Sequence, residues 1–158
     1  MENLKMNKFI LFIIHTSLGV GPLLFLGVIL FLSTQGERSV NVPDDMTSLL
    51  GKISIGILVA AIAISRFIDK LINKKIEGKD NETKIMIYQK FHIPRMAIMQ
   101  GPALLALVGI FLYTADGGSV FNTSVTFYNL FSFLVYITVW IALFPTSAKL
   151  NSILQLKD

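Results

Sequence analysis

The side chains of this sequence that are best suited to proton transfer or ligand binding lie inside long apolar stretches. His15 lies six residues after Phe9, where an apolar run begins, and Gln100 lies five residues after Arg95. On a helix these spacings are about 9 Å and about 7 Å, so the two side chains can lie at similar depth. We expect them to face each other or a shared cavity. The neighbours expected in this polar cluster are Thr16, Ser17, Ser65 and Arg95.

Two roles are open for such a cluster. Hydrogen bonds between helices would satisfy an imidazole and a carboxamide that hydrocarbon cannot satisfy, which is a structural role. The same side chains could line a path for an ion or a ligand, because an imidazole exchanges protons near neutral pH. The sequence is compatible with both.

Haem ligation is the other chemistry that the two histidines of the chain suggest. Two axial imidazoles would have to lie on facing helices at one depth. His92 precedes Pro94 and Arg95, at the edge of an apolar stretch, so its depth is expected to differ from that of His15. The chain has no cysteine, which excludes thiolate metal sites and thiol nucleophiles. We therefore predict no cofactor, no metal site, no catalytic residue and no enzymatic activity.

The elements that carry these side chains are predicted to be membrane-spanning helices. Hydrophobic residues make up 53% of the 158 residues and charged residues only 15%, with a mean hydropathy of +0.65. A soluble domain typically has about 25% charged residues, so a water-soluble globule is excluded. Charge-free stretches of about 20 residues are long enough to cross a bilayer. The sequence predicts an all-α bundle of four transmembrane helices.

The predicted spans are about 9–32, 46–67, 96–115 and 125–145, with a basic loop over 68–95. No aspartate or glutamate falls within any of these spans. Proteins that carry protons or sodium on a carboxylate in mid-membrane need such a residue. This class of ion-coupling site is therefore not expected.

The basic residues predict an orientation for the chain. Twelve lysines and arginines fall near the termini or in 66–95, and only Arg38 and Lys52 fall on the other side of the membrane. By the positive-inside rule both termini are expected in the cytoplasm, with the loops at 38–45 and 116–123 outside. Attraction to anionic lipid accounts for the basic segment without a nucleic-acid partner.

A short internal repeat connects the first and third spans. Gly21-Pro22 and Gly101-Pro102 stand 80 residues apart in similar surroundings, which suggests two duplicated helical hairpins. Each proline removes one hydrogen bond within its helix and is expected to kink it. Such a kink could serve packing alone or shape a path through the bundle.

Other spacings point to packing and anchoring. Gly56, Ala60 and Ala63 form a stripe of small residues on the second span, which would let another helix approach closely. Trp140 and Tyr128 lie near opposite ends of the fourth span, as expected for anchors at the two membrane interfaces.

The third span also carries a motif. Arg95, Ala97 and the run Gln100-Gly101-Pro102-Ala103-Leu104 are followed by Pro145-Thr146 near the end of the fourth span. Over about residues 85–150 the chain resembles a group of small uncharacterised bacterial four-helix membrane proteins with the pattern R-x-A-x-x-E-G-P-A-L. The resemblance implies the same fold and a bacterial inner membrane location, with no activity to transfer. Gln100 departs from the pattern, since it stands where the group has a glutamate.

Taken together, these features predict a non-enzymatic membrane protein that acts through helix association. It would be a homo-oligomer or an accessory subunit of a larger membrane complex. The alternative is a small transporter or channel with a polar path near His15 and Gln100. The lipid bilayer is the expected partner in either case, and nucleic acid is not.

Overall fold

A computed structural model describes residues 2–34, 44–115 and 123–154, and these form five helices. The helices are α1 (Glu2–Ser33), α2 (Asp44–Ile76), α3 (Asn81–Ala115), α4 (Thr123–Ala142) and α5 (Ser147–Leu154). The outward loops predicted at 38–45 and 116–123 lie largely outside the described residues.

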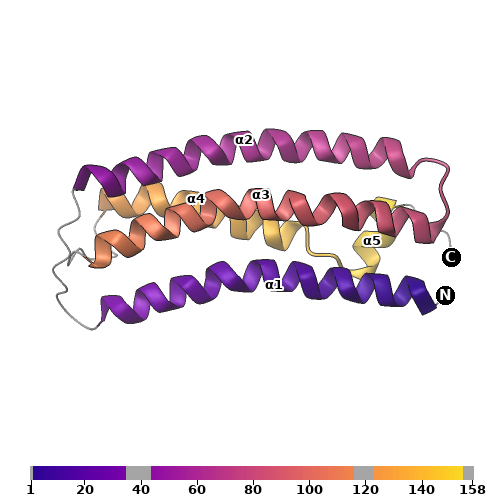
Figure 1. The fold of residues 1–158 in the computed structure, drawn as a ribbon, viewed down its shortest axis with the longest axis horizontal. Coiled ribbons are helices and arrows are strands. Elements are labelled where there is room, and N and C mark those ends of the chain that lie inside the picture. The colour runs from indigo at the N-terminus through magenta and orange to yellow at the C-terminus, as the bar shows by residue number, and fades with distance from the viewer. Residues whose placement is uncertain (1, 35–43, 116–122, 155–158) are drawn as a thin grey trace.

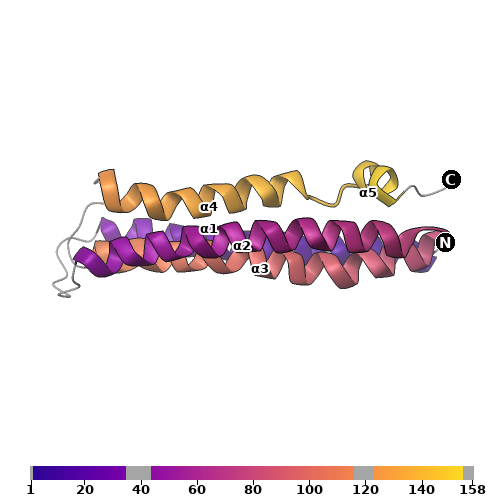
Figure 2. The same ribbon diagram turned by 90° about the horizontal axis from the view of Figure 1, so that it is seen from above.

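The helices form a packed, elongated bundle with α3 at its centre. α3 contacts α1 on one side and α2 on the other, and α4 packs against both α2 and α3 (Figure 1). Figure 2 shows α4 lying on one face of the layer that α1, α2 and α3 form. α1 and α3 run in one direction, and α2 and α4 run in the other. The start of α1, the α2–α3 turn and α5 therefore lie at the same end of the molecule.

Three of these helices are long and apolar enough to cross a membrane. They cover Asn7–Ser33, Met46–Ile76 and Asn81–Ala115, and the apolar part described in α4, Phe127–Ala142, is shorter. At 1.5 Å per residue the three long helices exceed the ~30 Å of a hydrocarbon core. The chain is therefore a multi-pass helical membrane protein, as its composition indicates.

The segment 68–95 is not a loop, and this prediction was wrong. α2 continues to Ile76 and α3 begins at Asn81, so that only a short turn separates them. Gly78 makes the turn with a φ of 69°, a left-handed conformation that glycine adopts without strain. The helices continue because apolar residues repeat every three or four positions along 68–95, and these pack together between the helices. The buried residues of this end are Leu11, Ile68, Ile72, Ile76, Ile85, Tyr88, Leu150 and Leu154.

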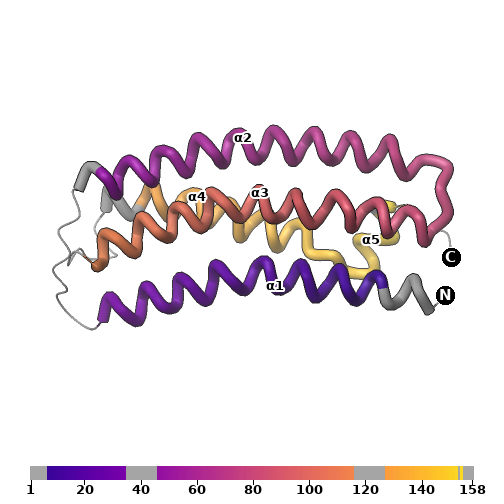
Figure 3. Tube along the Cα trace, in the orientation of Figure 1, coloured from indigo at the N-terminus to yellow at the C-terminus, as the bar shows by residue number. Residues whose placement is uncertain are grey.

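The prolines do not interrupt the helices. Pro22 lies inside α1, and Pro94 and Pro102 lie inside α3. Figure 3 shows both helices running on as continuous coils. Pro94 therefore neither ends nor begins a helix, and α3 starts well before the predicted span 96–115.

The small residues of α2 do not face the other helices of the chain. Gly56, Ala60 and Ala63 are exposed, and a Cβ added to Gly56 would meet nothing within 4 Å. The buried face of α2 is instead lined by Ser54, Leu58, Ala61 and Ser65. Large apolar side chains, among them Ile57, Val59 and Ile64, lie on the exposed face of α2, so hydrophobicity alone did not reveal which face is inside.

Candidate functional site: a buried histidine pair

His15 of α1 and His92 of α3 form a pair in the interior of the bundle. Their side chains are 0% and 1% exposed, and His15 Nδ1 lies 2.9 Å from His92 Nε2. The sequence-based estimate that their depths differ was wrong. It placed His92 outside the predicted span 96–115, whereas α3 begins at Asn81 and carries His92 into the packed bundle.

The hydrogen bonds assign the protons of the neutral pair. His15 Nε2 lies 3.0 Å from the carbonyl oxygen of Trp140, which can only accept a hydrogen bond. His15 Nε2 therefore carries the proton, and its Nδ1 accepts a hydrogen bond from His92 Nε2–H. The proton of His92 is then on Nε2, so that its Nδ1 keeps a lone pair. That buried nitrogen has no hydrogen-bond partner among the described residues.

Aromatic rings flank the histidine pair on both sides. The Tyr88 ring lies 4.9 Å from His92, His92 lies 5.1 Å from His15, and His15 lies 5.9 Å from Trp140, centroid to centroid. The Phe144 ring contacts the His15 ring edge-on, with the ring centroids 5.2 Å apart. The four rings come from three helices, which restricts the rotation of both imidazoles.

Gly19 allows Trp140 to reach the site. The indole Nε1–H donates a 2.9 Å hydrogen bond to the backbone oxygen of His15. A Cβ atom on Gly19 would overlap the indole ring, so a glycine is needed one turn after His15. Trp140 is therefore a packing residue of this site and not only an interfacial anchor.

Near the histidine pair, Arg95 of α3 and two residues of α2, Ser65 and Asp69, form a charged cluster. Arg95 donates two hydrogen bonds to the Asp69 carboxylate, at 2.6 and 3.0 Å, and its Nε–H donates to Ser65 Oγ at 2.6 Å. A bidentate pair of this kind neutralises the guanidinium, whose side chain is 8% exposed. Two of the residues expected in the polar cluster, Ser65 and Arg95, thus contact each other, and Asp69 completes their network.

The other expected members lie elsewhere. Gln100 is half-buried beside Gly21 and lies eight residues beyond His92, about 12 Å farther along α3. His15 faces His92 rather than Gln100. Ser17 is exposed and donates its hydroxyl hydrogen to the Ile13 carbonyl. Thr16 is half-buried next to the pair in sequence, and its Oγ1 has no partner among the described residues.

Further polar contacts continue toward the opposite end of the bundle. Tyr136 donates to the Leu18 carbonyl at 2.8 Å, and Ser54 and Ser132 share a hydrogen bond of 2.9 Å. Asn129 donates to the Thr47 carbonyl at 3.4 Å. The spacing of Asn129, Ser132 and Tyr136 on one helical face is a signal that the sequence analysis missed.

The pair does not have the geometry of a haem or metal site. A metal held between two opposed imidazoles requires nitrogens about 4 Å apart, because each metal–nitrogen bond is about 2.0 Å. The nitrogens of His15 and His92 are 2.9 Å apart, a hydrogen-bond distance that leaves no room for a metal ion between them. Among the described residues, no group of three histidine, cysteine, aspartate or glutamate side chains could hold a metal ion. What the arrangement can do is accept a proton at His92 Nδ1 or join α1, α3 and α4.

Comparison with protein-family models, curated proteins and solved structures finds no match to this chain.

Proposed function

We propose that this chain is a non-enzymatic membrane protein that acts by associating with other membrane helices. The association would form either a homo-oligomer or a larger complex in which the chain is an accessory subunit. The observation that carries the proposal is the exposed position of Gly56, Ala60 and Ala63 on α2. The resemblance of its third span to small four-helix proteins of the bacterial inner membrane supports the same class.

Small residues matter in a membrane because they let two helix backbones approach closely. Van der Waals packing and short interhelical contacts drive helix association in lipid, where burial of apolar surface between helices gains little. Gly56 leaves open space on the surface of α2. The buried polar groups, in contrast, bond mainly within the chain and hold α1, α2, α3 and α4 together.

The test is the mass of the protein after purification in mild detergent. We expect an oligomer or a complex with other chains. Replacing Ala60 with Leu should disrupt it, while Ala97→Leu on the exposed face of α3 provides the matched control. A wild-type monomer with no co-purifying chain, or equal behaviour of the two variants, would contradict the proposal.

Transport of a proton is the second candidate, and the free lone pair of His92 Nδ1 favours it. A proton taken up there could shift to His15 through the shared hydrogen bond. Beyond His15 the next group is the Trp140 carbonyl, which accepts a hydrogen bond but cannot take the proton. The relay therefore ends inside the bundle unless a ring turns, and we rank this function second. Proton flux in liposomes that is lost with His92→Phe, but retained with Ala97→Leu, would reverse the ranking.

A further inference from the structure

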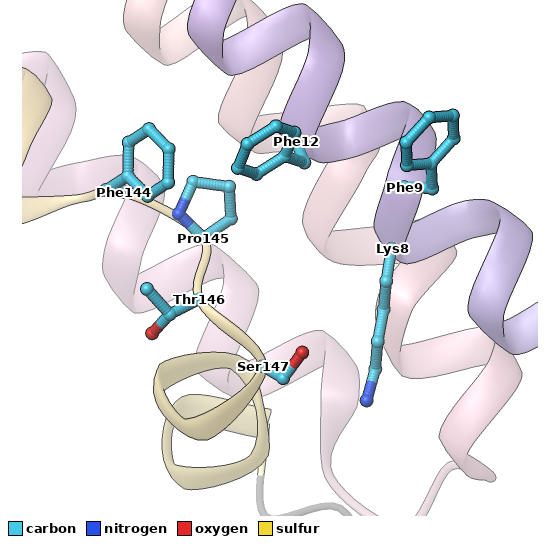
Figure 4. Close-up of a pocket in the computed structure, with 7 residues that line it drawn as sticks. All are labelled: Lys8, Phe9, Phe12, Phe144, Pro145, Thr146 and Ser147. Carbon is cyan, nitrogen blue, oxygen red and sulfur yellow. The ribbon is translucent and has the colours of Figure 1, made fainter.

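We propose that a pocket between α1 and the α4–α5 turn binds the headgroup of an anionic phospholipid. α4 ends at Ala142 and α5 begins at Ser147, whereas α1 continues alongside both. The interruption leaves a pocket of about 390 Å³, which we name the Lys8 pocket. Its walls are formed by Lys8, Phe9 and Phe12 of α1 and by residues 144–147 of the α4–α5 turn (Figure 4).

One part of the Lys8 pocket is apolar and open to the surroundings. Phe9 and Phe12 are 62% and 42% exposed, although both are large hydrophobic side chains. Phe12 also contacts Phe144 edge-on, with the ring centroids 5.3 Å apart. These rings offer a surface against which one acyl chain can pack.

The other part is polar and favours an anion. The Lys8 ammonium group reaches α5 and donates a hydrogen bond to Asn151 Oδ1 at 3.1 Å. Thr146 caps α5, since its Oγ1 accepts from the Lys149 N–H and its carbonyl accepts from the Leu150 N–H. The N–H groups of Ser147 and Ala148, at the start of α5, have no acceptor within their own helix, and this helix end carries the positive pole of its dipole. The ammonium group and this helix end therefore both attract negative charge.

The position of the Lys8 pocket selects a phospholipid over other anions. Lys8 stands at the start of the apolar helix that spans Asn7–Ser33, where hydrocarbon meets headgroups. A phosphate at Lys8 would leave the acyl chains next to Phe9 and Phe12, which lie farther into the span. A free phosphate ion would contact only the polar half of the pocket. A zwitterionic lipid has no net charge, so it would be attracted less strongly by the Lys8 ammonium group.

The proposal is tested with the full chain in mild detergent, using phosphatidylglycerol and phosphatidylcholine with identical acyl chains. We expect phosphatidylglycerol to raise the unfolding temperature more and to form more lipid adducts in native mass spectrometry. Lys8→Met keeps an unbranched apolar side chain but removes the charge, so it should weaken phosphatidylglycerol binding about fivefold, as expected for one basic residue at the membrane surface. Lys8→Arg should retain binding.

Two controls make the result specific. Lys74→Met removes an exposed charge at the same end of the molecule and should leave binding unchanged. Phe12→Ala should weaken lipid binding, whereas Phe67→Ala, which truncates an exposed ring on α2, should not. Three results would overturn the proposal. They are equal binding of the two lipids, an equal loss of phosphatidylglycerol binding in Lys8→Met and Lys74→Met, and an equal rise in unfolding temperature with inorganic phosphate alone. Native mass spectrometry counts lipid adducts on the folded protein, so it compares lipid binding between variants even if one of them has a lower unfolding temperature.

Discussion

His15 and His92 stand 77 residues apart in the chain, yet their imidazole centroids lie 5.1 Å apart and the two rings share a hydrogen bond. The contact joins the first and third helices, and the Trp140 carbonyl joins the fourth helix to it. Each nitrogen that takes part is buried, so the loss of one partner leaves another polar group unsatisfied.

This coupling predicts a non-additive mutant cycle. His15→Phe leaves the His92 N–H and the Trp140 oxygen without partners, which should lower the free energy of unfolding by about 1–3 kcal/mol. His92→Phe should act similarly on His15. The double variant should be less destabilised than the sum by about 0.5–3 kcal/mol, because the paired groups are removed together. The measurement is unfolding in detergent. As a control, the changes in the free energy of unfolding caused by His15→Phe and by Ser33→Ala, at the distant end of α1, should add. Additive changes for His15→Phe and His92→Phe would argue against the contact between the two histidines.

The approach of Trp140 to Gly19 predicts a position-specific effect of alanine. Gly19→Ala places a methyl group where the indole lies and should destabilise the bundle by about 1–3 kcal/mol. Gly27→Ala on the same helix meets nothing within 4 Å and should be neutral or stabilising, since alanine favours a helix by up to about 1 kcal/mol. Thermal unfolding of the two variants provides the comparison. Equal unfolding temperatures would mean that Trp140 does not pack on α1.

The start of α3 should make a pH-dependent contribution to stability. The side-chain hydrogen bond from Thr83, together with the 3.1 Å bond from the Thr83 backbone N–H, lowers the pKa of Asp80 below its ordinary value of 3.8. The stabilisation is therefore complete above the ordinary pKa and is lost as the pH falls through the lower folded pKa. The difference in unfolding temperature between wild type and Asp80→Asn should shrink over this acidic range. Glu77→Gln, in the exposed turn nearby, is the control, and a constant difference for Asp80→Asn would refute a role of its charge.

The orientation inferred from the basic residues predicts which sites a membrane-impermeant thiol reagent can reach. Thr34 and Lys79 are both exposed and lie at opposite ends of the bundle, and the chain has no cysteine of its own. In intact cells, Thr34→Cys should be labelled and Lys79→Cys should be labelled only after the membrane is opened. The reverse pattern would place both termini outside.

Local sequence was sufficient to predict the class of the protein and most of its helices. The stretch from Phe9 to Leu32 is mostly apolar and contains no lysine, arginine, aspartate or glutamate, and hydropathy over such a run decides whether a helix can cross a membrane. The extension of α2 and α3 through 68–95 was also encoded locally. Ile68, Ile72 and Ile76 recur every four residues, but the many lysines between them favoured a loop in the sequence analysis.

The tertiary structure alone decided which residues meet in the interior. The contact of His15 with His92 depends on how far α1 and α3 are shifted along each other and how each is rotated, and no short-range pattern contains that information. The shift is compatible with close packing because Gly19 admits Trp140, and Trp140 belongs to a helix far away in sequence. The exposed position of Ala60 likewise follows from the burial of Ser54, Leu58 and Ser65 against neighbouring helices. Hydropathy determines that a helix enters the membrane, whereas complementary side-chain shapes on several helices determine which face it turns inward.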